Sequence, residues 1–253
     1  TLLIGCAAAG AMSSIFKAPI AAIIFAIEVF SLDLTLASML PLLLASISAI
    51  ITSYSFFGSD VLLPFKLEDV FTINDVPFFI FLGVVTGVTS IYFTEVYDRI
   101  QKIFDKIDSP IKRLLVGGLG LGVLVYFIPP LYGEGFDVIN SLINGNPEEA
   151  LQNNFMNLDL TNVWVVILLL LGLVLFKVIA SSLTFGAGGV GGIFAPTLFM
   201  GSLMGNAVAK IINNIGLFNN SVSESNFTLV GMAGLMAAVL HAPLTAIFLI
   251  AEV

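Results

Sequence analysis

Residues 178–209 read VIASSLTFGAGGVGGIFAPTLFMGSLMGNAVA, a run of 32 positions without a charged side chain. A single helix of that length would measure about 48 Å, whereas the hydrocarbon core of a bilayer is only about 30 Å thick. Five glycines occupy the seven positions from Gly186 to Gly192, and glycine strongly disfavours a continuous helix. The stretch therefore predicts a helix, a glycine break and a second helix that starts near Phe194. Broken helices are typical of transporter ion sites.

The rest of the composition agrees with a membrane environment. Hydrophobic residues make up 58% of the 253 positions and charged residues 10%, against roughly 25% charged in soluble domains. Further charge-free runs cover residues 34–59, 76–94 and 114–133, and a spanning helix needs about 20 apolar residues. These numbers exclude a soluble globular protein, a disordered chain and a nucleic-acid binder. They predict an all-α, multi-pass integral membrane protein of the inner or plasma membrane.

The basic residues indicate an orientation. Five of the nine lysines and arginines lie between Arg99 and Arg113, and we expect this loop to be cytoplasmic by the positive-inside rule. The next loop, residues 129–161, has acidic residues but neither lysine nor arginine. We expect it on the opposite side. The alternative is that the basic cluster is only a solvated helix end.

Two segments resemble each other at an offset of 224 residues: KAPIAAIIFAIEV at 17–29 and HAPLTAIFLIAEV at 241–253. With the residues upstream, nine of 25 positions are identical. In the first copy they are Ala9, Gly10, Met12, Ala18, Pro19, Ala22, Ile23, Glu28 and Val29. An internal repeat of this length predicts two homologous halves in inverted topology. Residues 1–33 would end the first half and residues 34–253 would form nearly all of the second. The alternative is chance similarity between two apolar helix pairs.

Each copy of the repeat contains a proline that should separate two helices. Proline breaks a helix interior but suits the first turn, so we expect helices to begin at Pro19 and Pro243. Small-residue helices over 7–16 and 231–240 should precede them. Small residues there permit close helix packing in lipid.

At this point the sequence resembles a known family. GGIFAP at 191–196 resembles the GxFxP element of the CLC chloride channel and antiporter family, and residues 177–205 around it resemble the same region. The two repeated segments resemble that family's matching helix pairs. The resemblance implies a two-fold homodimer, an anion pathway in each subunit, and anions held by helix N-termini near mid-membrane. It implies that the backbone N–H groups of Ile193 and Phe194 contact chloride.

The candidate anion-binding residues are Gly192, Ile193, Phe194, Ala195 and Pro196. A helix N-terminus offers N–H donors and a partial positive charge without a full cation, which allows the ion to leave again. Glycine lets the backbone approach an ion closely, and Pro196 in the first turn loses no helix donor. The alternative for Phe194 is a packing residue beside a glycine turn.

The resemblance leaves several of the family's elements unmatched. Neither its serine-bearing GSGIP loop nor its GxEGP loop with the gating glutamate occurs, and its inner tyrosine would follow Val253. Since the chain also begins and ends inside apolar stretches, we interpret it as a piece of a longer membrane protein. We expect this piece alone not to transport ions.

One position bears on proton coupling. Many proton-coupled members of the family carry two consecutive glutamates at the end of the first repeated segment, whereas this chain has Glu28 followed by Val29. The valine weakens the case for a standard chloride–proton antiporter without excluding coupling. Intramembrane acids are usually functional. Glu28 is therefore either a proton-carrying acid or a structural one, and its counterpart Glu252 favours a capping or interface role.

The leading hypothesis is transport of chloride or a similar small anion, as a channel or an anion–proton exchanger. A fluoride- or nitrate-selective member is one alternative, and a purely structural membrane subunit is another. An intramembrane enzyme is a remote one, because a single histidine, His241, and a single cysteine, Cys6, supply little for catalysis or for a metal. We expect no cofactor and no nucleic acid. The expected partners are the anion, the lipid bilayer and a second copy bound through 7–29 and 231–253.

Overall fold

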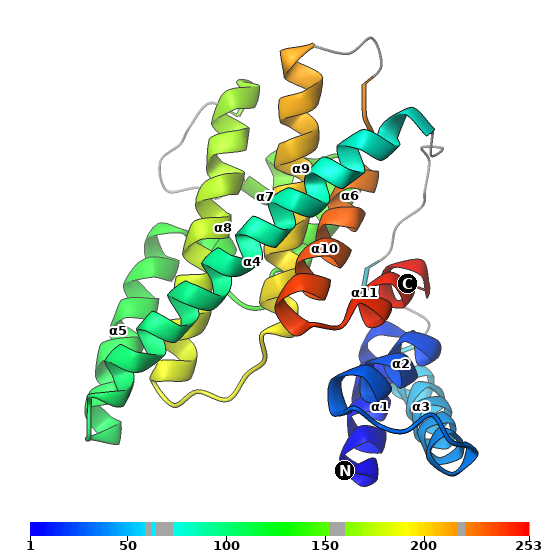
Figure 1. Ribbon diagram of the computed structural model, residues 1–253. Helices are drawn as coiled ribbons and strands as arrows, with labels where there is room; N and C mark the ends of the chain where they lie inside the picture. The colour runs from blue at the N-terminus through cyan, green and yellow to red at the C-terminus, as the bar shows by residue number, and fades with distance from the viewer. Residues whose placement is uncertain (59–61, 64–72, 152–159, 217–220, 253) are drawn as a thin grey trace. The chain divides into compact units, whose positions relative to one another are not determined.

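The computed structural model describes residues 1–58, 62–63, 73–151, 160–216 and 221–252. Over these residues the chain is helical and contains no strand (Figure 1). The elements are α1 (Leu2–Phe16), α2 (Pro19–Phe30), α3 (Leu36–Phe57), η1 (Ile73–Asp75), α4 (Val76–Asp105), α5 (Pro110–Phe127), η2 (Pro129–Leu131), α6 (Phe136–Ile143), α7 (Pro147–Leu151), α8 (Val163–Gly186), α9 (Phe194–Ile215), α10 (Glu224–Leu240) and α11 (Pro243–Glu252). The all-α prediction is confirmed.

Within the described ranges, four segments are long and apolar enough to cross a membrane: α3, η1 with α4, α5 and α8. The helices α1, α2, α10 and α11 are apolar but shorter. Prolines begin α2 and α11, as expected, while α1 and α10 start earlier than predicted, at Leu2 and Glu224. Short apolar helices of this kind need neighbours, since about 20 residues are required to span the hydrocarbon core.

The chain divides into two compact units, residues 1–66 with 236–253, and residues 67–235. These units are defined by contacts within the structure. The predicted division after residue 33 separates the two internal repeats instead, and it stays a prediction.

In the first unit, α1 packs closely on α3. The Ser13 hydroxyl donates to Ser46 O at 2.9 Å, and the Ser53 hydroxyl donates to Ser14 O at 2.8 Å. A Cβ on Gly10 would lie 3.5 Å from Ala45 O. Small residues on α1 therefore allow the close approach that the sequence predicts.

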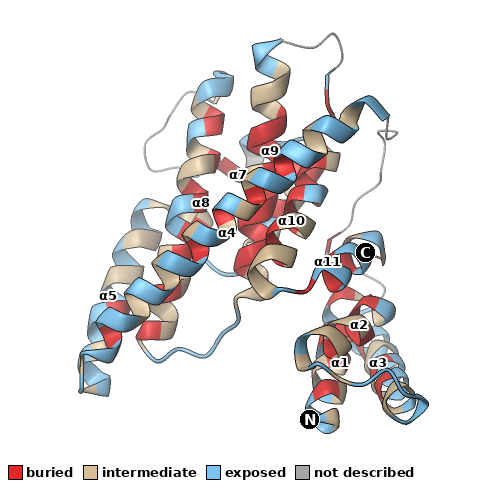
Figure 2. Ribbon diagram, viewed as in Figure 1, coloured by how far each residue is buried: buried red, intermediate tan, exposed pale blue. Residues whose placement is uncertain are grey.

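In the second unit, α8 packs against α4, α5 and α9. Figure 2 shows buried residues concentrated along α9 and α10, whereas α5 buries only Gly117 and exposes apolar side chains. Glycines bring α9 and α10 together, because a Cβ on Gly201 would lie 2.5 Å from Gly231 O. The exposed apolar surface of α5 suits lipid, and the buried α9 suits an internal position.

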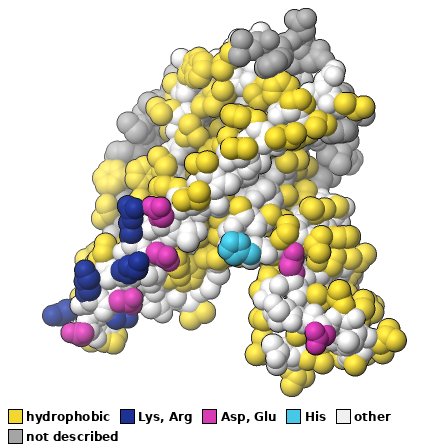
Figure 3. Space-filling view, viewed as in Figure 1, with side chains coloured by type: hydrophobic (Ala, Val, Ile, Leu, Met, Phe, Trp, Pro, Cys, Tyr) yellow, Lys and Arg dark blue, Asp and Glu magenta, His cyan; other side chains and the backbone are white. Residues whose placement is uncertain are grey.

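Two predicted loops contain more helix than expected. Four of the five residues of the basic cluster lie on the last turns of α4 and the first turn of α5, and Lys106 lies in the short connection, residues 106–109. Figure 3 shows its dark blue side chains gathered with acidic ones at that end of α4 and α5. The segment 129–161 holds η2, α6 and α7, and residues 152–159 lie outside the described part. Buried apolar side chains on α6, such as Ile139 and Leu142, explain why an acidic segment is helical.

Candidate anion-binding helix terminus

The glycine break is where α8 ends and α9 begins. The last turn of α8 is closed by three backbone bonds: the N–H groups of Ala187, Gly188 and Gly189 donate to carbonyls of residues 183–185 at 2.9–3.0 Å. Gly188 has a φ of +93°, a backbone conformation that favours glycine. The predicted helix, break and second helix from Phe194 are therefore observed.

The first turn of α9 contains Phe194, Ala195 and Pro196. Its first internal bond is donated by the Thr197 N–H to Ile193 O at 3.1 Å. The amides that come before this bond have no acceptor inside the helix, which is a general property of helix N-termini. The N-cap position is Ile193, whose side chain makes no capping bond, and the first turn has no acidic residue. The terminus therefore presents donors and a partial positive charge.

The approach to this terminus is lined by glycines. A Cβ on Gly192 would have the amide nitrogen of Phe194 as its nearest neighbour, at 4.0 Å. Gly191 and Gly192 are both exposed, and residues 193–195 are half-buried. A side chain at position 192 would stand beside the amides of the helix end, so glycine keeps this approach open for a small ligand. The five predicted site residues thus form one continuous helix start.

Glu252 shows how another helix start in this chain is occupied. Its carboxylate accepts bonds from the N–H groups of Ile20 at 3.0 Å and Ala21 at 2.7 Å. These amides belong to the first turn of α2, which begins at Pro19. The acid at the end of α11 therefore caps the start of α2.

Glu28 makes the reciprocal contact from the end of α2. Its carboxylate accepts from the N–H groups of Leu244 at 3.1 Å and Thr245 at 2.8 Å, and from the Thr245 hydroxyl at 2.7 Å. These residues form the first turn of α11. Each repeated helix thus supplies the carboxylate that caps the other. The structure places Glu28 in the first compact unit and residues 192–196 in the second.

Lys177 was not recognised as a candidate from the sequence. It lies within α8, is only 2% exposed, and donates to Leu131 O at 3.2 Å and to Gly133 O at 2.8 Å. Its ammonium also lies 4.4 Å from the ring centre of Phe199 on α9. A lysine in an apolar helix is costly in a membrane unless it has partners. The available signal was a lone cation inside the run 163–186.

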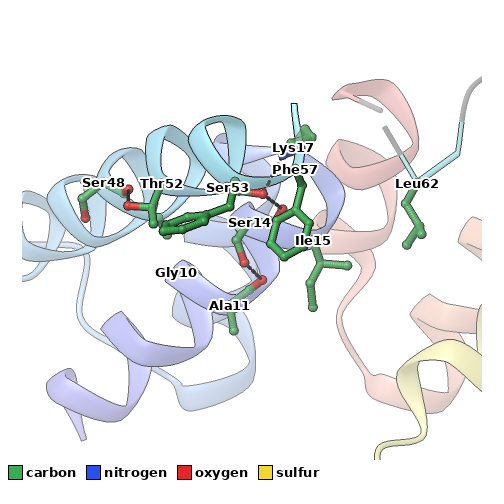
Figure 4. A pocket seen from close by; sticks show the side chains of 12 residues that line it. Gly10, Ala11, Ser14, Ile15, Lys17, Ser48, Thr52, Ser53, Phe57 and Leu62 are labelled. Atoms are coloured by element: carbon green, nitrogen blue, oxygen red, sulfur yellow. Dashed lines mark hydrogen bonds between the residues drawn. The ribbon is translucent and has the colours of Figure 1, made fainter. Parts of the chain in front are cut away.

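A separate cavity of about 750 Å³ lies in the first unit, between α1 and α3 (Figure 4). Lys17 reaches its wall and donates to the Ser53 hydroxyl at 2.6 Å, while its ammonium lies 4.5 Å from the Tyr54 ring centre. The Ser14 hydroxyl is turned back to Ala11 O at 2.8 Å. The polar groups of this wall thus bond to other groups of the protein. Across the described ranges, no group of three or more His, Cys, Asp or Glu residues could hold a metal.

Comparisons with known proteins identify the family of the chain. A family model described as "Voltage gated chloride channel" matches residues 1–253. A chloride channel protein named as ClcB-like, from Ralstonia nicotianae, is 30% identical over 252 residues, covering 99% of this chain and 54% of the relative. The H(+)/Cl(-) exchange transporter ClcA of Vibrio cholerae serotype O1 is 28% identical over 257 residues, covering 99% of this chain and 51% of the relative.

Among solved structures, the crystal structure of a CLC-type fluoride/proton antiporter superposes with a TM-score of 0.75 at 21% identity. The match covers 100% of this chain and 57% of that one, and at this identity it bears on the fold alone. The chain spans about half the length of the curated relatives it matches. Because the family match extends over all of its residues, the chain belongs to the CLC family of voltage-gated chloride channels.

Proposed function

We propose that the full-length protein containing this chain transports chloride or a similar small anion across a membrane. The observation that carries the proposal is the start of α9, where the helix end has no acidic residue and is approached over glycines. Such an end attracts an anion through backbone donors and the helix dipole. The relatives' names describe a channel and an exchange transporter, which supports transport rather than catalysis.

The N–H groups at Ile193 and Phe194 are the contacts we propose for the anion, with Gly192, Ala195 and Pro196 shaping the terminus. Backbone donors without a full positive charge bind an anion weakly enough for it to leave. A helix interrupted by glycines leaves backbone polar groups that must be covered by protein or face a water-filled cavity. A purely structural subunit would not require such an interruption, so this feature favours a transport pathway.

The proposed location is the inner membrane of a bacterium, since the relatives quoted above are bacterial. The basic turns between α4 and α5 would face the cytoplasm by the positive-inside rule. The segment around α6 would face the other side. The exposed apolar side chains of α5 and α3 would contact lipid.

The decisive experiment is flux from the full-length parent in liposomes, with a chloride gradient and a pH probe inside. Proton movement driven uphill by chloride would identify an exchanger, and Val29 would then require another proton route. Chloride movement without protons would identify a channel. Movement of fluoride but not chloride would retain the fold and overturn the choice of ion, and no anion movement would overturn the proposal.

We further propose that Glu28 is a structural acid. Three donors from the first turn of α11 surround its carboxylate and hold it in one position as a cap on that helix. A Glu28→Gln variant that keeps any chloride-driven proton movement would support this role. Loss of proton movement with unchanged chloride movement would assign Glu28 to the proton route instead.

A homodimer formed through 7–29 and 231–253 completes the proposal. The helices α2 and α11 in this region expose large apolar side chains, including Ile20, Leu244 and Ile247 at 54–59%. Cysteine crosslinking at Ile24 or Phe248, in a parent whose Cys6 is replaced by serine, tests it. A crosslinked dimer is expected, and the absence of one at both positions would contradict this interface.

A further inference from the structure

Lys177 is an enclosed cation that forms no ion pair with any described residue. The ion pairs in the described part of the chain are Arg99–Glu95 and Lys210–Glu224. The direct partners of the Lys177 ammonium are two neutral carbonyls and an aromatic ring. Glu134 interacts with it electrostatically from an exposed position, where water screens the carboxylate. Most of the positive charge of Lys177 is therefore not neutralised locally.

The ammonium lies near the helix that begins at the anion site. Phe199, whose ring it contacts, is five residues along α9 from Phe194, a rise of about 7.5 Å along the axis. Long side chains on a helix lean toward its N-terminus, which shortens the separation. The charge therefore lies on the order of 10 Å from the first turn of α9, too far for contact but close enough for a Coulomb attraction.

We propose that Lys177 determines anion affinity at the start of α9 by acting through its charge rather than by contact. This inference rests on the proposed function of that helix start. At an effective dielectric of about 20, a unit charge at this separation changes anion affinity on the order of tenfold. A remote charge raises occupancy without adding a direct ligand, so the anion can still leave. Its burial protects the attraction from screening by salt.

Lys177 also has a structural role that the test must separate from its charge. Its two hydrogen bonds tie the turn at Leu131 and Gly133 to α8, and their loss would disturb packing whatever the charge does. Lys177→Arg keeps the charge and the donors, whereas Lys177→Gln keeps N–H donors and removes the charge. Lys177→Met removes both.

Lys210 provides a matched control. It lies on α9 itself, its side chain is 12% exposed, and its ammonium is neutralised by Glu224 at 2.6 Å. The double variant Lys210→Met/Glu224→Gln removes a cation from the same helix without changing the net charge. We expect its half-saturating anion concentration to stay within twofold of the wild-type value.

The experiment measures anion flux of the full-length parent in liposomes against chloride and against nitrate, and chloride binding by calorimetry in detergent. We expect Lys177→Gln and Lys177→Met to raise the half-saturating concentration roughly tenfold for both anions, with their ratio unchanged. Lys177→Arg should stay within threefold of wild type. A purely structural role would instead lower the maximal rate or alter the ratio.

Two failures can be told apart. A wild-type parent that neither binds nor moves small anions overturns the proposed function and this inference together. A wild-type parent that binds chloride, with Lys177→Gln binding it within twofold, overturns this inference alone. Calorimetry measures chloride affinity directly, so the second outcome can be recognised even in a variant that transports chloride slowly.

Discussion

Three helices with a proline in the first turn differ in what faces their N-terminal amides. At α2 and α11 a glutamate carboxylate accepts two backbone N–H bonds at 2.7–3.1 Å. At α9 the N-cap is Ile193, and no described carboxylate bonds to the amides of Ile193 or Ala195. Pro19 and Pro243 are the first residues of their helices, whereas Pro196 is the third residue of α9. Among the described contacts, the starts of α2 and α11 have a glutamate bonded to their amides, and the amides of Ile193 and Ala195 do not.

The comparison separates a property of helices from a property of this site. Every helix start attracts negative charge, and the two capped ones show carboxylates held there by the fold. A tethered carboxylate has a high effective concentration and competes well with dissolved anions. An anion from solution is therefore expected at α9 rather than at α2 or α11. Among the described contacts, the absence of a carboxylate on the Ile193 and Ala195 amides distinguishes the start of α9 from the starts of α2 and α11.

The largest expected effect comes from giving α9 its own carboxylate. Ile193→Asp would place an acid at the N-cap, where it competes for the same donors. We expect chloride flux of the full-length parent to fall at least roughly 100-fold, equivalent to about 3 kcal/mol of affinity. Ile193→Leu is the matched control and should keep wild-type flux. Flux within threefold of wild type in the aspartate variant would contradict the assigned site.

Removing a carboxylate from a capped start should cost stability. We expect Glu252→Ala and Glu28→Ala each to lower the free energy of unfolding by about 2 kcal/mol, because each strips charged acceptors from a helix terminus. Thermal unfolding of the full-length protein in detergent measures the change. Glu95→Gln, which breaks an exposed pair with Arg99, should change stability by less than about 0.5 kcal/mol. Equal effects at all three glutamates would count against specific capping.

An uncapped start should also become a site for dissolved anions. In Glu252→Ala we expect chloride, compared with gluconate at equal ionic strength, to recover about 1 kcal/mol of stability by binding the folded state. The wild-type protein should respond less, because its α2 amides are already occupied. The measurement is the difference in unfolding temperature between the two salts. An identical response in wild type and variant would show that the α2 start does not accept chloride.

The smallest effect is expected from narrowing the approach to α9. Gly192→Ala adds a Cβ 4.0 Å from the Phe194 nitrogen, which is ordinary contact for the fold but crowds an anion there. We expect a two- to threefold rise in half-saturating chloride, equivalent to less than about 1 kcal/mol. Gly118→Ala on α5, where a Cβ meets nothing within 4 Å, should leave this concentration unchanged. If Gly118→Ala raised the half-saturating chloride concentration more than Gly192→Ala does, the proposed approach to α9 over Gly192 would be contradicted.

Local signals explain what the sequence predicts well. The break between α8 and α9 and the starts of α2 and α11 depend on glycine and proline, whose backbone preferences act within a few residues. The candidate site could also be predicted from the sequence. Residues 192–196 are contiguous, so the start of α9 alone brings them together. Recognition of the family on these motifs is confirmed by the match over residues 1–253.

Tertiary contacts explain what the sequence does not predict. Lys177 was not recognised as a candidate, because its partners are carbonyls of Leu131 and Gly133, more than 40 residues away, which allow that lysine inside α8. The sequence shows that Glu28 and Glu252 occupy equivalent positions in the repeat. It does not show that each carboxylate caps the start of the other helix, because these contacts join residues more than 200 positions apart. Helix α6 was missed because the acidic residues of its segment hid its buried apolar side.

Glu252 caps the start of α2, and Glu28 caps the start of α11. This reciprocal pair of contacts has the symmetry of an isologous interface, in which each partner contributes the same residue to the same contact. Two identical chains would form this contact across a two-fold axis, and here a single chain forms it with itself. A change in one of the two acids therefore alters a contact belonging to both repeats. We expect this contact to hold the two copies to a shared evolutionary history even as the sequences around it diverge.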